Sequence, residues 1–124
     1  MLAATKNAKK RKAAAGHNIL KRGADVEYFF IVISGEVDVI MENLFHTEVS
    51  LTRLGAGQFF GEIELMQGGQ AVAHVRAAEQ GAELVLIPKK LFFELIDGSP
   101  VTRSALNEAA TRHKTEHERR KLHQ

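Results

Sequence analysis

Residues 60–77, FGEIELMQGGQAVAHVRA, have the residue types of a loop that holds a phosphorylated ligand. A short helix that begins at Gly61 would point backbone N–H groups and the positive end of its dipole outward, which suits an anionic phosphate. Glycine at this position also lets a ligand approach the backbone closely. Between Gly61 and Arg76, however, the only residue that can carry a positive charge is His74. The segment therefore fits either a phosphate cradle without its cation or an ordinary turn between two strands.

Other arrangements of reactive side chains are weak. His113 and His117 stand four residues apart on one face of a predicted helix, but no third metal ligand lies near them in the sequence. His46 and His74 are isolated, and no Ser/His/Asp or Cys/His set is present. We therefore expect neither a metal site nor an enzyme.

Composition predicts one soluble domain. The chain has 124 residues, of which 44% are hydrophobic, and it contains no cysteine. This length supports a single core, and the absence of cysteine fits a reducing compartment. No apolar run reaches the roughly 20 residues of a membrane span, and the first residues lack the apolar stretch of a signal peptide. We expect a cytoplasmic location.

Charge is distributed unevenly along the chain. Residues 1–22 carry seven Lys or Arg and no acid, residues 23–98 carry four against twelve Asp or Glu, and residues 99–124 carry six against three. The basic run KNAKKRK at 6–12 has no interleaved aromatic residue and no DNA-reading motif beside it, so we expect no direct nucleic-acid binding. A solvated helix or linker over residues 1–15 is favoured, with contact to phosphate or an anionic membrane as the alternative.

The elements that would position the opening segment are short strands followed by helices. Glycine-rich turns separate aromatic, β-branched or alternating runs, which predicts an antiparallel β-roll of the jelly-roll type over residues 16–98. A lid-type helix and a polar tail are expected over residues 99–124, because Ser99–Pro100 is a typical helix start. The predicted strands cover residues 16–20, 28–34, 36–41, 48–54, 71–77 and 82–87, and a further helix covers 89–96.

At this point the sequence resembles the cyclic nucleotide-binding domains of catabolite-activator-type regulators, cyclic-nucleotide-dependent kinases and cyclic-nucleotide-gated channels. The matching motifs are Gly23, the block 28–37 (YFFIVISGEV), the block 55–63 (GAGQFFGEI) and the run 73–77 (AHVRA). The resemblance implies a β-roll with an N-terminal helix and two C-terminal helices, and a phosphate-binding cassette at residues 60–73. It also implies cyclic AMP or cyclic GMP as ligand, without a cofactor.

The resemblance assigns roles to particular residues. Glu62 is similar to the family carboxylate that accepts a hydrogen bond from the ribose 2′-hydroxyl, and the C-terminal helix would close over the base. The candidate nucleotide-binding residues are Gly61, Glu62, Ile63, Glu64, Ala71, Val72 and Ala73, and the candidate lid residues are Leu106 and Ala109.

The cassette departs from the family pattern at its phosphate end. Where the family usually shows Pro-Arg-Thr/Ser-Ala, this sequence shows Gln-Ala-Val-Ala at 70–73, so the arginine expected at Ala71 and the hydroxyl expected at Val72 are both missing. Glu64 adds an acid where the family commonly has a small residue. Arg76 falls on the other side of a strand from position 71, so we expect a surface or subunit contact from it.

Two functions remain open. The favoured one is a regulatory domain of a larger protein that binds a cyclic nucleotide weakly. The alternative is a dimerisation or docking module that keeps the fold without the ligand. A homodimer and a channel, transporter or other effector are the expected partners.

Overall fold

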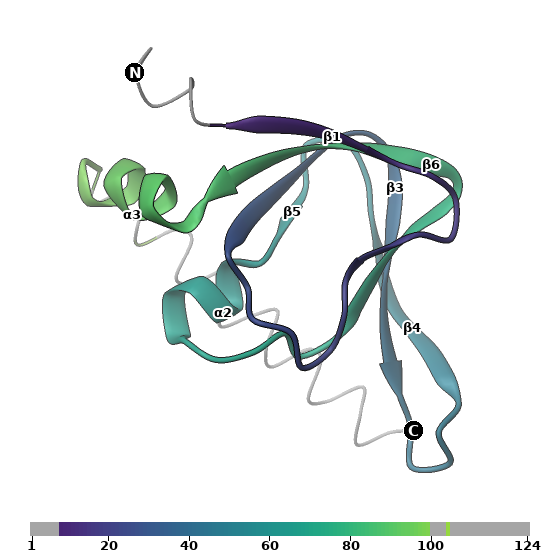
Figure 1. Cartoon of the computed structure of the whole chain (residues 1–124). Helices are drawn as coiled ribbons and strands as arrows, with labels where there is room; N and C mark the ends of the chain where they lie inside the picture. The colour runs from purple at the N-terminus through teal and green to yellow at the C-terminus, as the bar shows by residue number, and fades with distance from the viewer. Residues whose placement is uncertain (1–7, 100–103, 105–124) are drawn as a thin grey trace.

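Two long antiparallel strands form the centre of the fold (Figure 1). The computed structural model describes residues 8–99 and 104. The described strands are β1 (Lys9–Ala13), β2 (Asn18–Leu20), β3 (Tyr28–Glu42), β4 (Glu48–Leu54), β5 (Phe59–Phe60) and β6 (His74–Pro88), and the helices are α2 (Glu62–Gln67) and α3 (Lys89–Asp97). The strand order is β1-β6-β3-β4, with β2 also paired to β6 and β5 to β3, and every pairing is antiparallel. The predicted mainly β class with flanking helices is confirmed.

The long strands β3 and β6 each replace two predicted elements. Residues 28–34 and 36–41 form one strand, because Gly35 bends it through a positive φ of 74° without ending the ladder. Gly81 does the same for β6 with a φ of 76°. A Cβ on Gly35 would overlap the carbonyl oxygen of Gly81. The two paired strands can therefore approach each other this closely only at glycine. The strand expected from residue 71 begins instead at His74.

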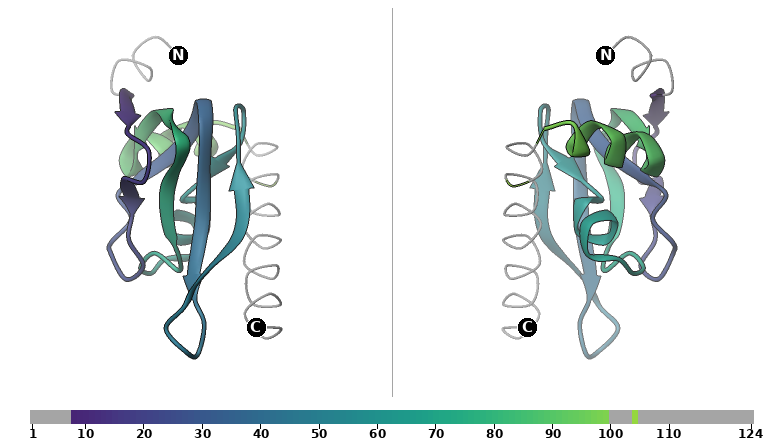
Figure 2. Two further views of the ribbon diagram at one scale, coloured as in Figure 1. Left: turned by 90° about the vertical axis from the view of Figure 1, so that its right-hand side faces the viewer. Right: turned by 90° about the vertical axis from the view of Figure 1, so that its left-hand side faces the viewer.

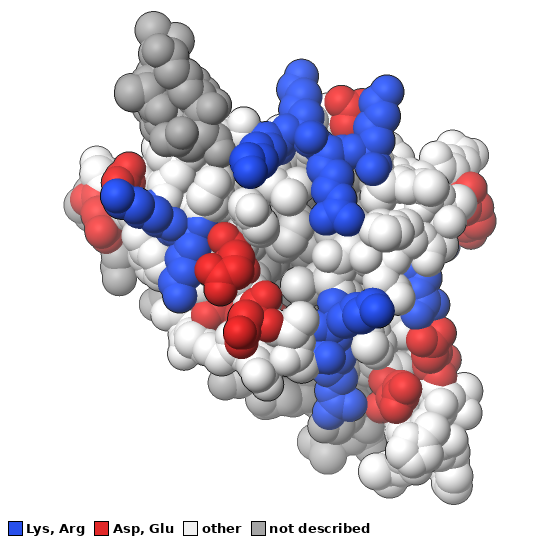
Figure 3. Space-filling view, viewed as in Figure 1, with Lys and Arg blue, Asp and Glu red and all other residues white. Residues whose placement is uncertain are grey.

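Residues 9–13 correct the prediction of a basic helix or linker at the N-terminus. They form β1, which pairs with β6 from Lys9 opposite Leu86 to Ala13 opposite Ala82. The lysines and the arginine of β1 are exposed, and only Ala13 is buried. The edge of β6 thus determines the conformation of a segment with little strand propensity of its own. Basic side chains gather over β1 (Figure 3), and lysine on an edge strand discourages pairing with another chain. The N-terminal residues 1–7 lie outside the described chain.

The core lies inside the curved strands, and α2 and α3 pack on the same side of the roll (Figure 2). The most deeply buried aliphatic side chains are Val32, Val37, Leu51 and Leu84. Helix α3 forms as predicted and packs Phe92 against Phe29, with 4.9 Å between their ring centroids. No helix in the described part of the chain is long and apolar enough to span a membrane. The candidate lid residues Leu106 and Ala109 lie outside the described residues.

Candidate functional site

Gly61 positions the candidate site. It has a φ of 96°, and a Cβ at this position would lie 2.8 Å from the carbonyl oxygen of Tyr28. Only glycine therefore allows the chain to pass β3 this closely and enter α2 at Glu62. The predicted short helix after Gly61 is present. It contains only six residues and carries two acids in its first turn, Glu62 and Glu64.

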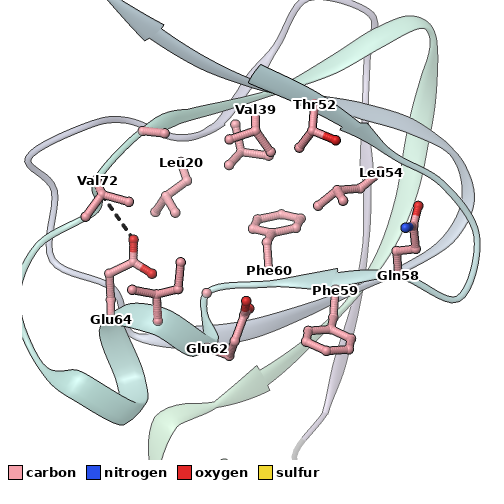
Figure 4. A pocket seen from close by; sticks show the side chains of 14 residues that line it. Leu20, Val39, Thr52, Leu54, Gln58, Phe59, Phe60, Glu62, Glu64 and Val72 are labelled. Carbon is pink, nitrogen blue, oxygen red and sulfur yellow. Dashed lines mark hydrogen bonds between the residues drawn. The ribbon is translucent and has the colours of Figure 1, made fainter. Parts of the chain in front are cut away.

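A cavity of about 180 Å³ lies between α2 and the strands of the roll (Figure 4). Six of the seven candidate nucleotide-binding residues line it: Gly61, Glu62, Ile63, Glu64, Val72 and Ala73. The seventh, Ala71, is buried beside the cavity with 3% of its surface exposed, and its short side chain is not part of the lining.

Sequence reasoning missed the strands' contribution to the cavity. These lining residues come from five different strands and the turn before β5: Leu20, Val39, Thr52, Leu54, Gln58, Phe59, Phe60 and Val75. Alternation in β3 and β4 indicates that Val39 and Leu54 face inward. It cannot show which inward residues border a cavity and which are closed off by packing. None of the described residues that line the cavity is Lys, Arg or His.

Glu62 is almost completely buried, with 1% of its surface exposed. It lies on the α2 side of the cavity in Figure 4. The side chain as a whole is not isolated, but its Oε2 atom accepts no hydrogen bond from the described residues. A buried carboxylate at a cavity wall can accept hydrogen bonds from a hydroxyl-bearing ligand.

Glu64 connects α2 to residues 70–73, which are called the cassette segment below. Its Oε2 atom accepts a hydrogen bond of 3.1 Å from the backbone N–H of Val72 (Figure 4). Burial raises the pKa of the Glu64 carboxyl above its usual range, the Val72 N–H acts in the opposite direction, and the charge of Glu62 raises it further. The side chain is 8% exposed. The Glu64 carboxylate thus already accepts the hydrogen bond of the Val72 N–H, at the end of the cavity where the ligand's phosphate was expected.

The cassette segment is held by backbone hydrogen bonds. The N–H of Gly23 donates to the carbonyl of Ala71 at 2.8 Å, and the N–H of Ala71 donates to the carbonyl of Ala24 at 2.8 Å. An isolated bridge joins Asp25 to Gln70. These contacts hold residues 70–71 against residues 23–25 without help from a ligand, and the Val72 amide that follows donates to Glu64.

Arg76 and His74, which can both carry a positive charge, do not line the cavity. Arg76 donates to both carboxylate oxygens of Glu48, at 2.9 and 2.8 Å, and to Asn18 at 2.9 Å. This confirms the expected surface contact for Arg76. The Nδ1 atom of His74 accepts a hydrogen bond of 3.1 Å from the backbone N–H of Arg22. His74 therefore uses this nitrogen to hold β6 to the segment after β2.

Comparison with curated relatives shows similarity to nucleotide-regulated proteins. The chain is 33% identical over 72% of its length to the cAMP-activated global transcriptional regulator of Haemophilus influenzae, and spans 40% of that protein. It is 33% identical over 56% of its length to the cAMP-dependent protein kinase regulatory subunit of Blastocladiella emersonii, and spans 17% of it. The chain thus spans well under half of these relatives.

Solved structures share the fold. The catabolite activator protein of Thermus thermophilus superposes with a TM-score of 0.81 at 26% identity, over 94% of this chain and 54% of that one. The regulatory subunit of a cAMP-independent protein kinase A from Trypanosoma brucei gives 0.80 at 24% identity, over 98% and 43%.

Two further structures were solved with ligands. In a T. brucei variant bound to cAMP, a glutamate is replaced by alanine and the residues seven and eight positions later, threonine and valine, by arginine and alanine (TM-score 0.72, 19% identity, 93% and 43% covered). The Trypanosoma cruzi counterpart is bound to guanosine (0.69, 21%, 79% and 34%). The sequence model of the cyclic nucleotide-binding domain matches residues 10–99. The chain therefore belongs to the cyclic nucleotide-binding domain family.

Proposed function

We propose that this domain is a ligand-sensing regulatory module in which a buried carboxylate has replaced the phosphate site, so that cyclic AMP and cyclic GMP bind weakly at neutral pH. The hydrogen bond from the Val72 N–H to Glu64 carries the proposal. The Glu64 carboxylate is an anion of the protein itself at the position where the resemblance places the ligand's phosphate.

The energetic penalty has two parts. A hydrogen bond from a charged donor contributes about 1.5–3 kcal/mol, and Ala71 cannot make one. A ligand phosphate about 4 Å from an ionised Glu64 would also meet a repulsion of about 4 kcal/mol at an effective dielectric constant near 20. Each effect alone weakens binding by tenfold or more. We expect a dissociation constant for cyclic AMP well above about 1 µM.

The spacing of the altered residues supports the proposal. Glu64, Ala71 and Val72 stand seven and eight residues apart, the same spacing as the three positions replaced in the T. brucei variant that was solved with cAMP. The natural T. brucei protein has glutamate and valine at two of these positions and is described as cAMP-independent. The guanosine-bound T. cruzi structure further indicates that this fold accommodates a ligand without phosphate.

The regulated partner is proposed from the size of the relatives. Because the chain spans well under half of the two relatives described above, we propose that it acts within, or together with, a larger effector in the cytoplasm, with a homodimer as one assembly. A docking module without ligand is the second candidate, and the absence of a cation from the described cavity lining favours it.

Calorimetric titration with cyclic AMP at fixed salt separates the two candidates. The double variant Ala71→Arg/Val72→Thr should gain roughly thirtyfold to a thousandfold in affinity over wild type, from one charged and one neutral contact. Adding Glu62→Ala to the double variant should remove much of the gain, because the ribose contact of Glu62 and the restored phosphate contacts hold the same ligand. Circular dichroism and thermal unfolding check the fold. If the double variant folds like wild type and binds no better, the docking module is the better account.

A further inference from the structure

We infer that the cavity binds an unphosphorylated nucleoside, with Glu62 and Glu64 accepting hydrogen bonds from the ribose hydroxyls. The inference rests on the proposed function, because it takes the cavity to be a ligand site, and it names the class of ligand.

The direction of the hydrogen bonds at the phosphate end carries the inference. A cyclic phosphate bridges the 3′ and 5′ oxygens of the ribose, so it presents only acceptors and negative charge there and needs donors from the protein. In this cavity the Val72 N–H is engaged at 3.1 Å by Glu64, which itself presents only acceptor atoms when ionised. Without the phosphate, the 3′- and 5′-oxygens become hydroxyl donors. At this end of the cavity a nucleoside offers hydrogen-bond donors where a cyclic nucleotide offers acceptors. Glu64 offers acceptors where a phosphate site would offer donors, so the nucleoside and Glu64 are complementary.

The ribose end shows no such reversal. Glu62 stays at the cavity wall next to Gly61, where an acceptor suits a 2′-hydroxyl in a nucleoside and in a cyclic nucleotide alike. Both carboxylates lie on α2, two residues apart, at the same cavity. Two buried acceptors, with no cation among the described residues of the lining, disfavour an anionic ligand. They favour one with several neutral hydroxyl donors.

The remaining walls suit the base of such a ligand. They are mostly apolar, as in most small-molecule sites, and include Leu20, Val39, Leu54, Phe60 and Val75. The cavity volume of about 180 Å³ lies below the roughly 300–1,000 Å³ of typical ligand pockets. A nucleoside needs less enclosed space than its cyclic phosphate, and its base can extend through the mouth of the cavity.

The test is calorimetric titration of the whole 124-residue chain with adenosine, guanosine and inosine, each against its own 3′,5′-cyclic monophosphate. At least one nucleoside should bind at least tenfold more tightly than its cyclic partner. Removing the 3′- or the 5′-hydroxyl, in deoxy analogues of that nucleoside, should weaken binding by roughly tenfold or more, as expected for a lost hydrogen bond to a charged acceptor.

Variants assign the effect to Glu64. In Glu64→Ala the nucleoside should bind at least tenfold less tightly, and the same deoxy analogue should cost nothing further, because the hydroxyl has lost its acceptor. Glu48→Gln, on the outer face of the roll, is the matched control and should leave both affinities unchanged. An equal cost of the deoxy change in wild type and in Glu64→Ala would overturn the role of Glu64.

The outcomes also separate this inference from the proposed function. If no nucleoside binds wild type more tightly than its cyclic partner, while Ala71→Arg/Val72→Thr gains cyclic AMP, the nucleoside inference is overturned and the proposed function stands. If wild type itself binds cyclic AMP with a dissociation constant below about 1 µM, both are overturned.

Discussion

Carboxylates on the outer face of the roll and carboxylates at the cavity beneath it have opposite surroundings. Outside, Arg76 pairs with Glu48, and Arg53 pairs with Asp38 at 2.7 Å and with Glu79 at 3.1 Å. Inside, the carboxylates of the lining face a cavity whose described walls contain no cation.

The difference shows which carboxylates need a functional explanation. Exposed pairs between neighbouring strands contribute little to stability and cost little. A buried carboxylate whose hydrogen bonds come from backbone N–H groups, as in Glu64, carries a desolvation cost that a structural role does not require. Perturbed groups of this kind gather at binding sites. The contrast therefore supports the cavity as the site and the outer ion pairs as structural contacts.

The largest expected effect comes from Gly61, because both cavity carboxylates depend on it and the outer pairs do not. Gly61→Ala should lower the free energy of unfolding by more than the roughly 1–3 kcal/mol of a left-handed alanine, since the new Cβ would also lie 2.8 Å from the carbonyl oxygen of Tyr28. Gly57→Ala is the control, because Gly57 has a φ of 85° but no atom within 4 Å of an added Cβ. Urea unfolding measures both, and equal losses would contradict the close approach at Gly61.

A smaller effect is expected on the outer face. Arg76→Ala removes the hydrogen bonds to Glu48 and to Asn18 of β2 and should cost about 1 kcal/mol. Arg76→Lys should recover only part of this, because lysine cannot form the two-pronged contact. The preference of the cavity between ligands should not change in either variant. A change in that preference by calorimetry would show that the two regions are coupled.

The smallest effects are pH-dependent and have opposite signs. Burial raises the pKa of Glu64, so the folded state disfavours its ionised form and loses stability as pH rises from about its ordinary value through the raised one. Glu64→Gln should therefore stabilise the protein at pH 7, and this gain should vanish near pH 4.

The pKa of Glu48 is shifted in the opposite direction, so its effect on stability depends on pH with the opposite sign. The hydrogen bonds from Arg76 hold its pKa below the usual range, so its contribution is present at pH 7 and is lost as pH falls through that lowered value. Glu48→Gln should be neutral or destabilising at pH 7 and neutral in acid. Thermal unfolding of both variants between pH 3 and 8 checks the signs. The same sign for both would contradict the distinction between the two regions.

Sequence reasoning reached the fold and the short helix after Gly61 because both depend on local signals. Gly61 and the apolar alternation of β3 and β4 are visible in the sequence. Strand β1 was missed, since its basic residues adopt a strand only because β6 offers them an edge. The single bent strands were missed because Gly35 and Gly81 resemble turn residues until their mutual contact is known. The hydrogen bond between Glu64 and Val72 joins two elements, and no local pattern specifies it.

The central claim is that Glu64 keeps an anion out of the cavity. It is tested most directly by cyclic AMP titration, at pH 7 and fixed salt, of Ala71→Arg/Val72→Thr with and without an added Glu64→Gln. Glutamine keeps an acceptor for the Val72 N–H and removes the charge. The added substitution should raise cyclic AMP affinity by about tenfold or more, equivalent to at least about 1.4 kcal/mol. Equal affinities of the two proteins would contradict the claim.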